Sequence, residues 1–168
     1  MGMKFTPQFS SYDITEFIRR QVSVVENATL DQLQQIGEQF VRDARSTSTY
    51  KDRTRNLRGS IGYIILKDGA VVFGNFVEPN RKSTGKRTTK KAKKESVENF
   101  VGTELGRKLA IEIGKEHPVG YVLVVVAGMS YAGYVEAKGY DVLTGSSLSA
   151  EANLVKAINK IQARLKKL

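Results

Sequence analysis

The chain of 168 residues carries a formal net charge of +10 and contains no cysteine. Its length is that of one domain, which buries about 68–70% of its unfolded surface without covalent cross-links. The lack of cysteine excludes disulfides, thiolate metal sites and a cysteine nucleophile. The first eight residues lack the apolar core of a signal peptide, and no apolar run approaches the ~20 residues of a membrane span. We therefore expect neither export nor a membrane partner.

Two consecutive helices are predicted at the start of the chain. The first spans residues 14–25, where apolar side chains recur at helical spacing. Asn27 and Ala28 separate it from a second helix, which Thr29 caps. The predicted inward face of this second helix consists of Leu30, Leu33, Ile36, Gly37, Phe40, Val41 and Ala44.

A polar loop then leads into two strands. Leu57 and Ile61 stand at an even spacing that puts both side chains on one face of a sheet, so we predict a strand over residues 57–66. A second strand is predicted over residues 70–77. The intervening Asp68-Gly69 is typical of a tight hairpin turn. The glycines predicted within the first strand, Gly59 and Gly62, indicate bulges or close packing.

Most of the net charge lies in one segment. Residues 81–94 contain eight basic residues and no acidic one; removing these eight from the 27 lysines and arginines leaves 19, against 17 acidic residues. No aliphatic side chain larger than alanine is present, so burial cannot offset the ordering entropy, and we predict a mobile basic arm over residues 78–95. Its eight cationic side chains are Arg81, Lys82, Lys86, Arg87, Lys90, Lys91, Lys93 and Lys94.

The basic arm has two interpretations. One is a solvated loop that aids solubility. The other, which is favoured, is contact with phosphate groups, because a run of like charge repels itself and gains most when a polyanion releases its counterions. No aromatic residue is interleaved with the lysines, so neither base stacking nor sequence readout is expected. The expected nucleic-acid partner is double-stranded DNA bound without sequence preference.

A third helix is predicted to begin with Ser96 as its cap and to end before Pro118, which cannot continue it. The next segment, Tyr121–Ala127, is apolar and β-branched. We predict that it is a central strand covered on both faces. The predicted inward face of the third helix consists of Val97, Phe100, Val101, Leu105, Leu109 and Ile113.

Directly after this strand, the sequence changes from apolar residues to tyrosines and charges. Tyr131, Tyr134 and Val135 fall on one helical face, and Gly139 stands where a short helix would stop. The tyrosines either cover the end of the core or anchor a contact with another chain.

A short strand at Val142 and Leu143 and a last helix from Ser147 or Ser149 are predicted at the end of the chain. The order of elements predicts a single α+β domain over residues 1–168, in which a small, mostly antiparallel sheet packs against helices. The predicted inward face of the last helix consists of Leu148, Ala152, Val155, Ile158, Ile161 and Leu165.

Two segments about seventy residues apart resemble paired motifs of one protein family. Residues 53–61 read R-T-R-N-L-R-G-S-I, and residues 131–136 read Y-A-G-Y-V-E. Together they resemble the R-T-G-N-L-R-x-S-I and Y-A-x-Y-V-E-x-G segments of the tail-completion family of tailed bacteriophages and prophages, also described as neck or head-to-tail connector proteins. The resemblance covers residues 30–168. Arg55 stands where the family pattern has glycine, and the basic arm is an insertion.

The resemblance implies a structural virion protein, a ring subunit of the neck that joins head to tail around the path of the DNA. The implied ring is six-fold, with twelve-fold as the alternative. Its partners would be further copies of the chain, head or portal-adaptor proteins and tail proteins, met in the host cytoplasm during assembly. The alternative function is a free nucleic-acid-binding protein without sequence preference. To the subunit interface we assign Tyr131, Tyr134 and Glu136 together with Arg53 and Arg58.

Catalytic chemistry finds little support in the sequence. His117 is the only histidine and stands at a predicted helix end, where a polar terminal residue is expected more often than a general base. Without it, no Ser–His–acid set can be assembled. The carboxylates are spread over solvent-facing helical positions and do not cluster as metal ligands would. We therefore predict no enzyme activity, no catalytic residue, no metal and no cofactor.

Overall fold

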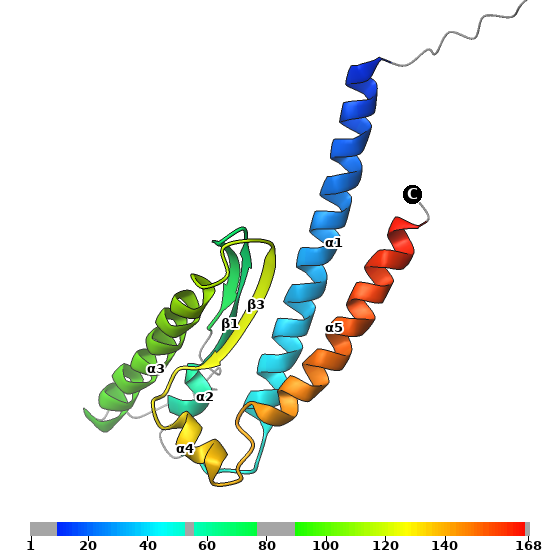
Figure 1. Cartoon of the computed structure of the whole chain (residues 1–168). Helices are drawn as coiled ribbons and strands as arrows, with labels where there is room; N and C mark the ends of the chain where they lie inside the picture. The colour runs from blue at the N-terminus through cyan, green and yellow to red at the C-terminus, as the bar shows by residue number, and fades with distance from the viewer. Residues whose placement is uncertain (1–9, 53–55, 77–89, 167–168) are drawn as a thin grey trace, which may run out of the picture.

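The fold consists of helices on both sides of a small antiparallel sheet (Figure 1). The computed structural model describes residues 10–52, 56–76 and 90–166, and of residues 90–101 only the backbone. This arrangement confirms the predicted α+β class. The elements of the described part are α1 (Ser11–Ser46), α2 (Asn56–Ser60), β1 (Ile61–Lys67), β2 (Ala70–Asn75), α3 (Lys90–Gly114), β3 (Tyr121–Ala127), α4 (Ala132–Ala137) and α5 (Thr144–Leu165).

The sheet has the strand order β2-β1-β3, and both pairings are antiparallel. β3 has the predicted bounds, but it is an edge strand, and the prediction that it is central was wrong. The central strand is β1, whose Ile61 pairs with Ala127 and whose Lys67 pairs with Tyr121. An apolar run indicates that both faces of a strand are covered, whereas the number of hydrogen-bonded neighbours leaves no mark in the side-chain pattern.

Alternate residues of β1 belong to two separate parts of the core. Tyr63 packs with Phe40 of α1, whereas Ile64 and Leu66 pack with Ala110 of α3. Successive strand side chains point to opposite faces, so α1 covers one face of the sheet and α3 covers the other. α5 lies against α1 as a further layer (Figure 1).

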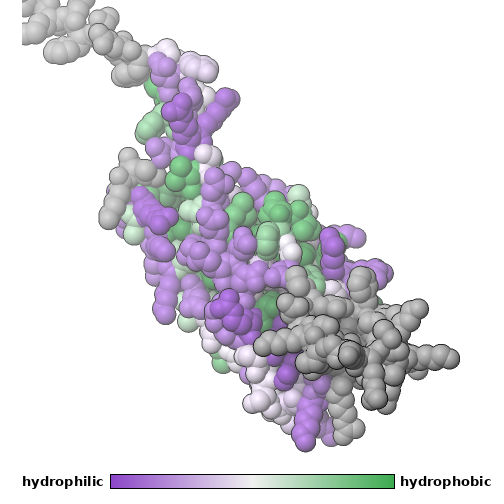
Figure 2. Space-filling view, turned by 180° about the vertical axis from the view of Figure 1, so that it is seen from behind, coloured by the Kyte–Doolittle hydropathy of each residue, from purple (hydrophilic) through white to green (hydrophobic). Residues whose placement is uncertain are grey.

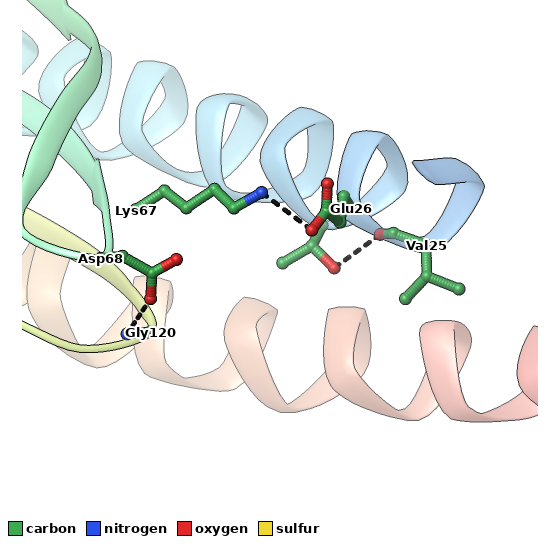
Figure 3. Close-up of polar contacts among 6 residues, drawn as sticks. Val25, Glu26, Lys67, Asp68 and Gly120 are labelled. Atoms are coloured by element: carbon green, nitrogen blue, oxygen red, sulfur yellow. Dashed lines mark hydrogen bonds and ion pairs between the residues drawn. The ribbon is translucent and has the colours of Figure 1, made fainter. Parts of the chain in front are cut away.

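The predicted hairpin turn is confirmed. Asp68 and Gly69 both have positive φ, 51° and 77°, as a two-residue type I′ turn requires. Two polar contacts hold the turn in place (Figure 3): Lys67 Nζ lies 2.8 Å from a carboxylate oxygen of Glu26 in α1, and the Gly120 N–H donates to Asp68 Oδ1 at 2.9 Å. The hairpin is thereby fastened both to α1 and to the start of β3.

The N-terminal helix α1 is continuous over 36 residues, where two helices were predicted. Ser10 caps it, because its hydroxyl accepts the Asp13 N–H at 3.2 Å while the Asp13 carboxylate accepts the Ser10 N–H at 2.8 Å. Thr29, the predicted second cap, instead donates its hydroxyl to the Val25 carbonyl at 2.8 Å. The residues between the two predicted helices include neither glycine nor proline, and a weak helix former is tolerated where an apolar face continues on both sides.

Residues 56–60 form the short helix α2 and not the beginning of a strand. Leu57 and Ile61 are both buried, but they are related by one helical turn and not by alternation along a strand. A separation of four residues fits both patterns, so the spacing could not decide between them. Gly59 consequently belongs to a helix. The close packing predicted for Gly62 is confirmed, since a Cβ there would lie 2.2 Å from the ring of Phe76.

The helix α3 begins at Lys90 and not at the predicted Ser96, so the last part of the segment 78–95 is helical. It ends at Gly114, before Pro118, as predicted. The helix was not predicted over residues 90–95 because this run of basic residues contains no large apolar side chains, whose spacing is the signal used to recognise a helix.

Of the predicted inward face of α3, Ile113 packs against the core as predicted, whereas Leu105 and Leu109 do not, and the side chains of Val97, Phe100 and Val101 lie outside the described residues. Leu105 and Leu109 are 42% and 37% exposed. A Cβ on Gly106 would lie 2.4 Å from the carbonyl oxygen of Ser60, so the backbone of α3 approaches the end of α2, next to the start of β1, more closely than a large side chain allows. The buried residues recur at four-residue spacing and are Gly102, Gly106, Ala110 and Gly114.

The helix α5 repeats this pattern. It begins at Thr144, and the strand predicted at Val142 and Leu143 does not form. Its buried residues are Ser146 and Ala157, both small. The predicted inward face was wrong, because most of its large members are exposed: Leu148 by 65%, Val155 by 55%, Ile158 by 46% and Leu165 by 46%.

Candidate subunit interface

Both segments that resemble the phage family contribute to one groove, the first through Leu57 and the second through Tyr131, Tyr134 and Val135. α2 directly precedes β1, and α4 follows closely after β3. Because Ile61 and Ala127 are paired in the antiparallel sheet, the start of β1 and the end of β3 lie together, and so do the segments attached to them. The groove has a volume of about 760 Å³ and is named the tyrosine groove. Its lining is Ser48, Thr49, Tyr50, Lys51, Asp52, Leu57, Tyr131, Tyr134, Val135, Lys138 and Tyr140.

Arg58, which was assigned to the interface, supports the wall of the groove from within the subunit. Its guanidinium Nη2 donates to the Thr47 carbonyl at 2.5 Å, and its Cζ lies 5.4 Å from the centroid of the Tyr50 ring. The backbone N–H of Arg58 donates to Asp52 Oδ2 at 2.8 Å. These contacts connect both ends of the loop between α1 and α2, so Arg58 positions this loop.

The Tyr50 side chain forms part of the groove lining and of the core. It is 9% exposed and packs with the cluster that contains Leu57. Burial raises the pKa of the Tyr50 phenol above its ordinary value, and the nearby Arg58 acts in the opposite direction. The phenol is therefore a neutral, fixed group in this wall at physiological pH.

Glu136, also assigned to the interface, caps the start of α5. Its Oε2 accepts the N–H groups of Val142 and Leu143 at 3.2 Å each, and its Oε1 accepts the Thr144 N–H at 3.0 Å and the Thr144 hydroxyl. Burial alone raises the pKa of Glu136, but the hydrogen bonds from Thr144 and its neighbours outweigh burial and hold this pKa below its usual value. The carboxylate thus joins α4 to α5.

The two assigned tyrosines are accessible to a partner. Tyr134 is 65% exposed and Tyr131 is 38% exposed, both at α4. The Lys138 Nζ lies 5.2 Å from the centroid of the Tyr134 ring, one helical turn further on. Gly139 has φ +83° and follows the end of α4, as the predicted helix stop requires. α4 therefore presents aromatic rings at the surface, while its Glu136 side chain binds the start of α5 and holds the helix in place.

The structure does not describe the side chains of the basic arm or of Arg53. Four of the arm's lysines lie in the first turns of α3, where only the backbone is described: Lys90, Lys91, Lys93 and Lys94. The remaining predicted contact residues lie outside the described residues: Arg53, Arg81, Lys82, Lys86 and Arg87.

Sequence reasoning missed six residues of the groove lining: Ser48, Thr49, Tyr50, Lys51, Lys138 and Tyr140. Tyr50 follows a polar run of serines and threonines, and an aromatic residue in such a loop is a signal that could have been noticed. Tyr140 stands one residue after the glycine that ends α4. The two lysines carried no signal, because lysines are common on any surface.

The chain matches no family model, no curated protein and no solved structure in the three comparisons made. Among the residues that the structure describes, no group of three or more acidic, histidine or cysteine side chains is arranged to hold a metal ion. Within the same residues, none of the helices combines the length and the apolar character that crossing a membrane requires.

Proposed function

We propose that this protein is a non-enzymatic structural subunit of a bacteriophage neck, which closes into a ring and joins head to tail around the path of the DNA. The observation that carries the proposal is that both segments resembling the tail-completion family lie at one groove, although about seventy residues separate them. If the two segments served only to fold their own parts of the chain, they would not need to meet; a shared functional surface explains why both lie at the same groove.

Uncovered apolar side chains support a role within an assembly. Large apolar residues of α1, α3 and α5 are exposed, and Val71, Val72 and Phe73 of β2 are 47%, 46% and 38% exposed. Figure 2 shows such side chains gathered in patches between polar ones on one face of the molecule. Extended apolar surface of this kind marks contacts with other chains. A six-fold ring, or alternatively a twelve-fold one, covers it by contacts between neighbours, and head and tail proteins cover it at the two ends.

The experiment that tests this proposal replaces Tyr134 by aspartate in a producing phage. A charge at an exposed aromatic of the groove becomes desolvated when a partner binds, so we expect joined particles to be lost while the subunit remains folded. Val119→Asp is the matched control, because Val119 is 80% exposed and lies between α3 and β3, away from the groove. Normal yields of tailed particles that contain the Tyr134→Asp subunit would contradict the proposed interface.

A free nucleic-acid-binding protein is the second candidate function. The observation that favours it is the placement of Lys90, Lys91, Lys93 and Lys94 in the first turns of α3. A helix N-terminus carries partial positive charge, so four cations there repel it, and a bound phosphate relieves the repulsion. Tight duplex binding by the isolated monomer, with normal particle joining by a subunit that lacks these charges, would favour this function over the neck role.

A further inference from the structure

The second half of α5 carries positive charge that no acidic residue of the same segment balances. Residues 152–166 contain four cations and no carboxylate, and all four cations are exposed. Residues 104–116 differ, because the exposed cations Arg107, Lys108 and Lys115 are interspersed there with three glutamates. α5 therefore presents charge of one sign at the surface, which attracts a polyanion. Its four cations are Lys156, Lys160, Arg164 and Lys166.

Two of these lysines line a pocket between α5 and α1. The two helices lie side by side as separate layers of the subunit (Figure 1). The pocket has a volume of about 310 Å³ and no acidic residue in its lining, and it is named the α1–α5 pocket. Ile36 and Ala157 are the buried residues of this lining. Its polar residues are Gln32, Gln35, Asn153, Lys156 and Lys160.

The cations of the α1–α5 pocket are not neutralised by the part of the subunit that the structure describes. Neither Lys156 nor Lys160 forms an ion pair with any described residue. Asp31 stands four residues before Gln35 on α1, but it lies outside the lining and pairs with neither lysine. Both lysines also stand more than one turn before Leu165, where α5 ends, so the attraction of a helix C-terminus for cations does not explain them. Their charge remains available to an anionic ligand.

The polar groups of the pocket match the oxygen atoms of a phosphate diester. Gln32 Nε2 donates to Gln35 Oε1 at 3.2 Å, so among the described residues the Gln35 amide N–H groups remain able to donate to a ligand. Ammonium and carboxamide groups supply the donors that phosphate oxygens accept. Lys156, Lys160 and Arg164 recur at four-residue spacing and therefore span about 12 Å along one side of α5. One strand of duplex DNA presents a phosphate about every 3.4 Å along its axis, so more than one phosphate falls within that length.

We propose that the α1–α5 pocket binds phosphate groups of the backbone of duplex DNA. Lys156 and Lys160 are the neutralising cations, Gln35 donates a hydrogen bond, and Arg164 extends the contact along α5. No aromatic residue lines the pocket, so the contact carries no sequence preference.

This inference rests on the proposed function, because it identifies the side of the ring subunit that faces the genome. The α1–α5 pocket shares no lining residue with the tyrosine groove, so DNA and a neighbouring subunit do not compete for one site. Two or three phosphate contacts in one subunit give weak binding, which the copies of a ring add together.

The experiment measures the affinity of the full chain for a labelled duplex of about 20 base pairs, between about 50 and about 200 mM salt. Lys156→Gln combined with Lys160→Gln should reduce the magnitude of the slope of log K against log salt concentration by at most about 1.8, because each lost phosphate contact removes about 0.9. Lys108→Gln combined with Lys115→Gln is the matched control, which removes the same charge from exposed positions far along the sequence. This control should leave the slope nearly unchanged.

A second pair of variants tests the pocket itself. Gln35→Glu places a carboxylate beside the bound phosphate and should weaken duplex binding about fivefold. Gln162→Glu is the matched control, because it makes the same change of charge at an exposed position of α5 outside the pocket lining. This control should leave the affinity nearly unchanged. Thermal unfolding of all the variants checks that the fold is intact.

Three results would overturn the inference. Equal losses in the two double variants would show that net charge, and not the pocket, attracts DNA. Unchanged affinity after Lys156→Gln combined with Lys160→Gln would exclude the pocket as a DNA site. Equal effects of Gln35→Glu and Gln162→Glu would place the phosphate outside the pocket. In each of these cases the neck role stands if Tyr134→Asp still prevents particle joining, because that test does not depend on the α1–α5 pocket.

Discussion

Gly128 and Gly106 are in contact: a Cβ on Gly128 would lie 2.3 Å from the Cα of Gly106. The contact joins the residue that follows β3 to the middle of α3. It allows the chain to leave the sheet close under α3 and to continue into α4, where Tyr131 and Tyr134 are presented. The position of the tyrosine groove therefore depends on a helix and a strand end that approach each other without side chains between them.

Replacing Gly128 by alanine should destabilise the fold. The added methyl overlaps backbone atoms of α3, which cannot rotate away, and such overpacking costs about 1–3 kcal/mol. Gly133→Ala is the matched control, because no atom lies within 4 Å of a Cβ there and alanine favours the helix α4 by about 0.5–1 kcal/mol. Urea denaturation of both variants measures the difference. Equal unfolding midpoints for Gly128→Ala and the unsubstituted chain would contradict the close contact.

Replacing Glu136 by glutamine should weaken the junction of α4 and α5 and change the acid dependence of stability. The pKa of this carboxyl is lower in the folded chain than its usual value of 4.5, because hydrogen bonds outweigh burial. A group of this kind contributes stability above its unfolded pKa and loses it as the pH falls through the folded pKa. We expect the variant to lose about 1 kcal/mol at neutral pH, as for other helix caps, and to lose less on acidification below about pH 4.5.

Urea denaturation between pH 3 and pH 7 provides this measurement, with Glu151→Gln as the control, because Glu151 is exposed on α5, the helix that Glu136 caps. Parallel pH profiles for the unsubstituted chain and Glu136→Gln would show that Glu136 does not titrate differently on folding.

Replacing Lys90, Lys91, Lys93 and Lys94 by glutamine should weaken duplex binding equally for all sequences. Each phosphate neutralised contributes about −0.9 to the slope of log K against log salt concentration, so four lost contacts reduce the slope by at most about 3.6. Glutamine preserves helix propensity, and removal of cations from the start of α3 favours the helix. Thermal stability should therefore not fall. Affinity measured across a salt series checks the slope.

A matched control removes the same number of charges elsewhere, at Lys108, Lys115, Lys156 and Lys160, all of which are exposed. If both variants lose affinity to the same extent, net charge and not the arm determines binding. If the arm variant keeps its DNA affinity but loses binding to a purified head or tail protein, the arm is a protein-docking element.

The sequence alone determined those features that local rules control. Asp68-Gly69 predicted the hairpin because few residues adopt positive φ at both turn positions. The apolar, β-branched run of Tyr121–Ala127 predicted a strand with its observed bounds, and Gly139 marked the end of α4. The motif pair also singled out Tyr131 and Tyr134, which the structure places at the surface in the lining of one groove.

Only the tertiary structure decided which faces are buried and what the assigned charges do. Hydrophobic periodicity selected Leu105 in α3 and Leu148 in α5 as inward residues, yet both helices pack through small side chains. Close approach of two backbones excludes large side chains from the contact, so Leu105 and Leu148 remain exposed. The four-residue spacing of the small residues in α3 was the signal that hydrophobic periodicity passed over. In the same way, whether Arg58 and Glu136 face a neighbour or support their own subunit depends on groups that the fold brings to them, Thr47 for one and the start of α5 for the other.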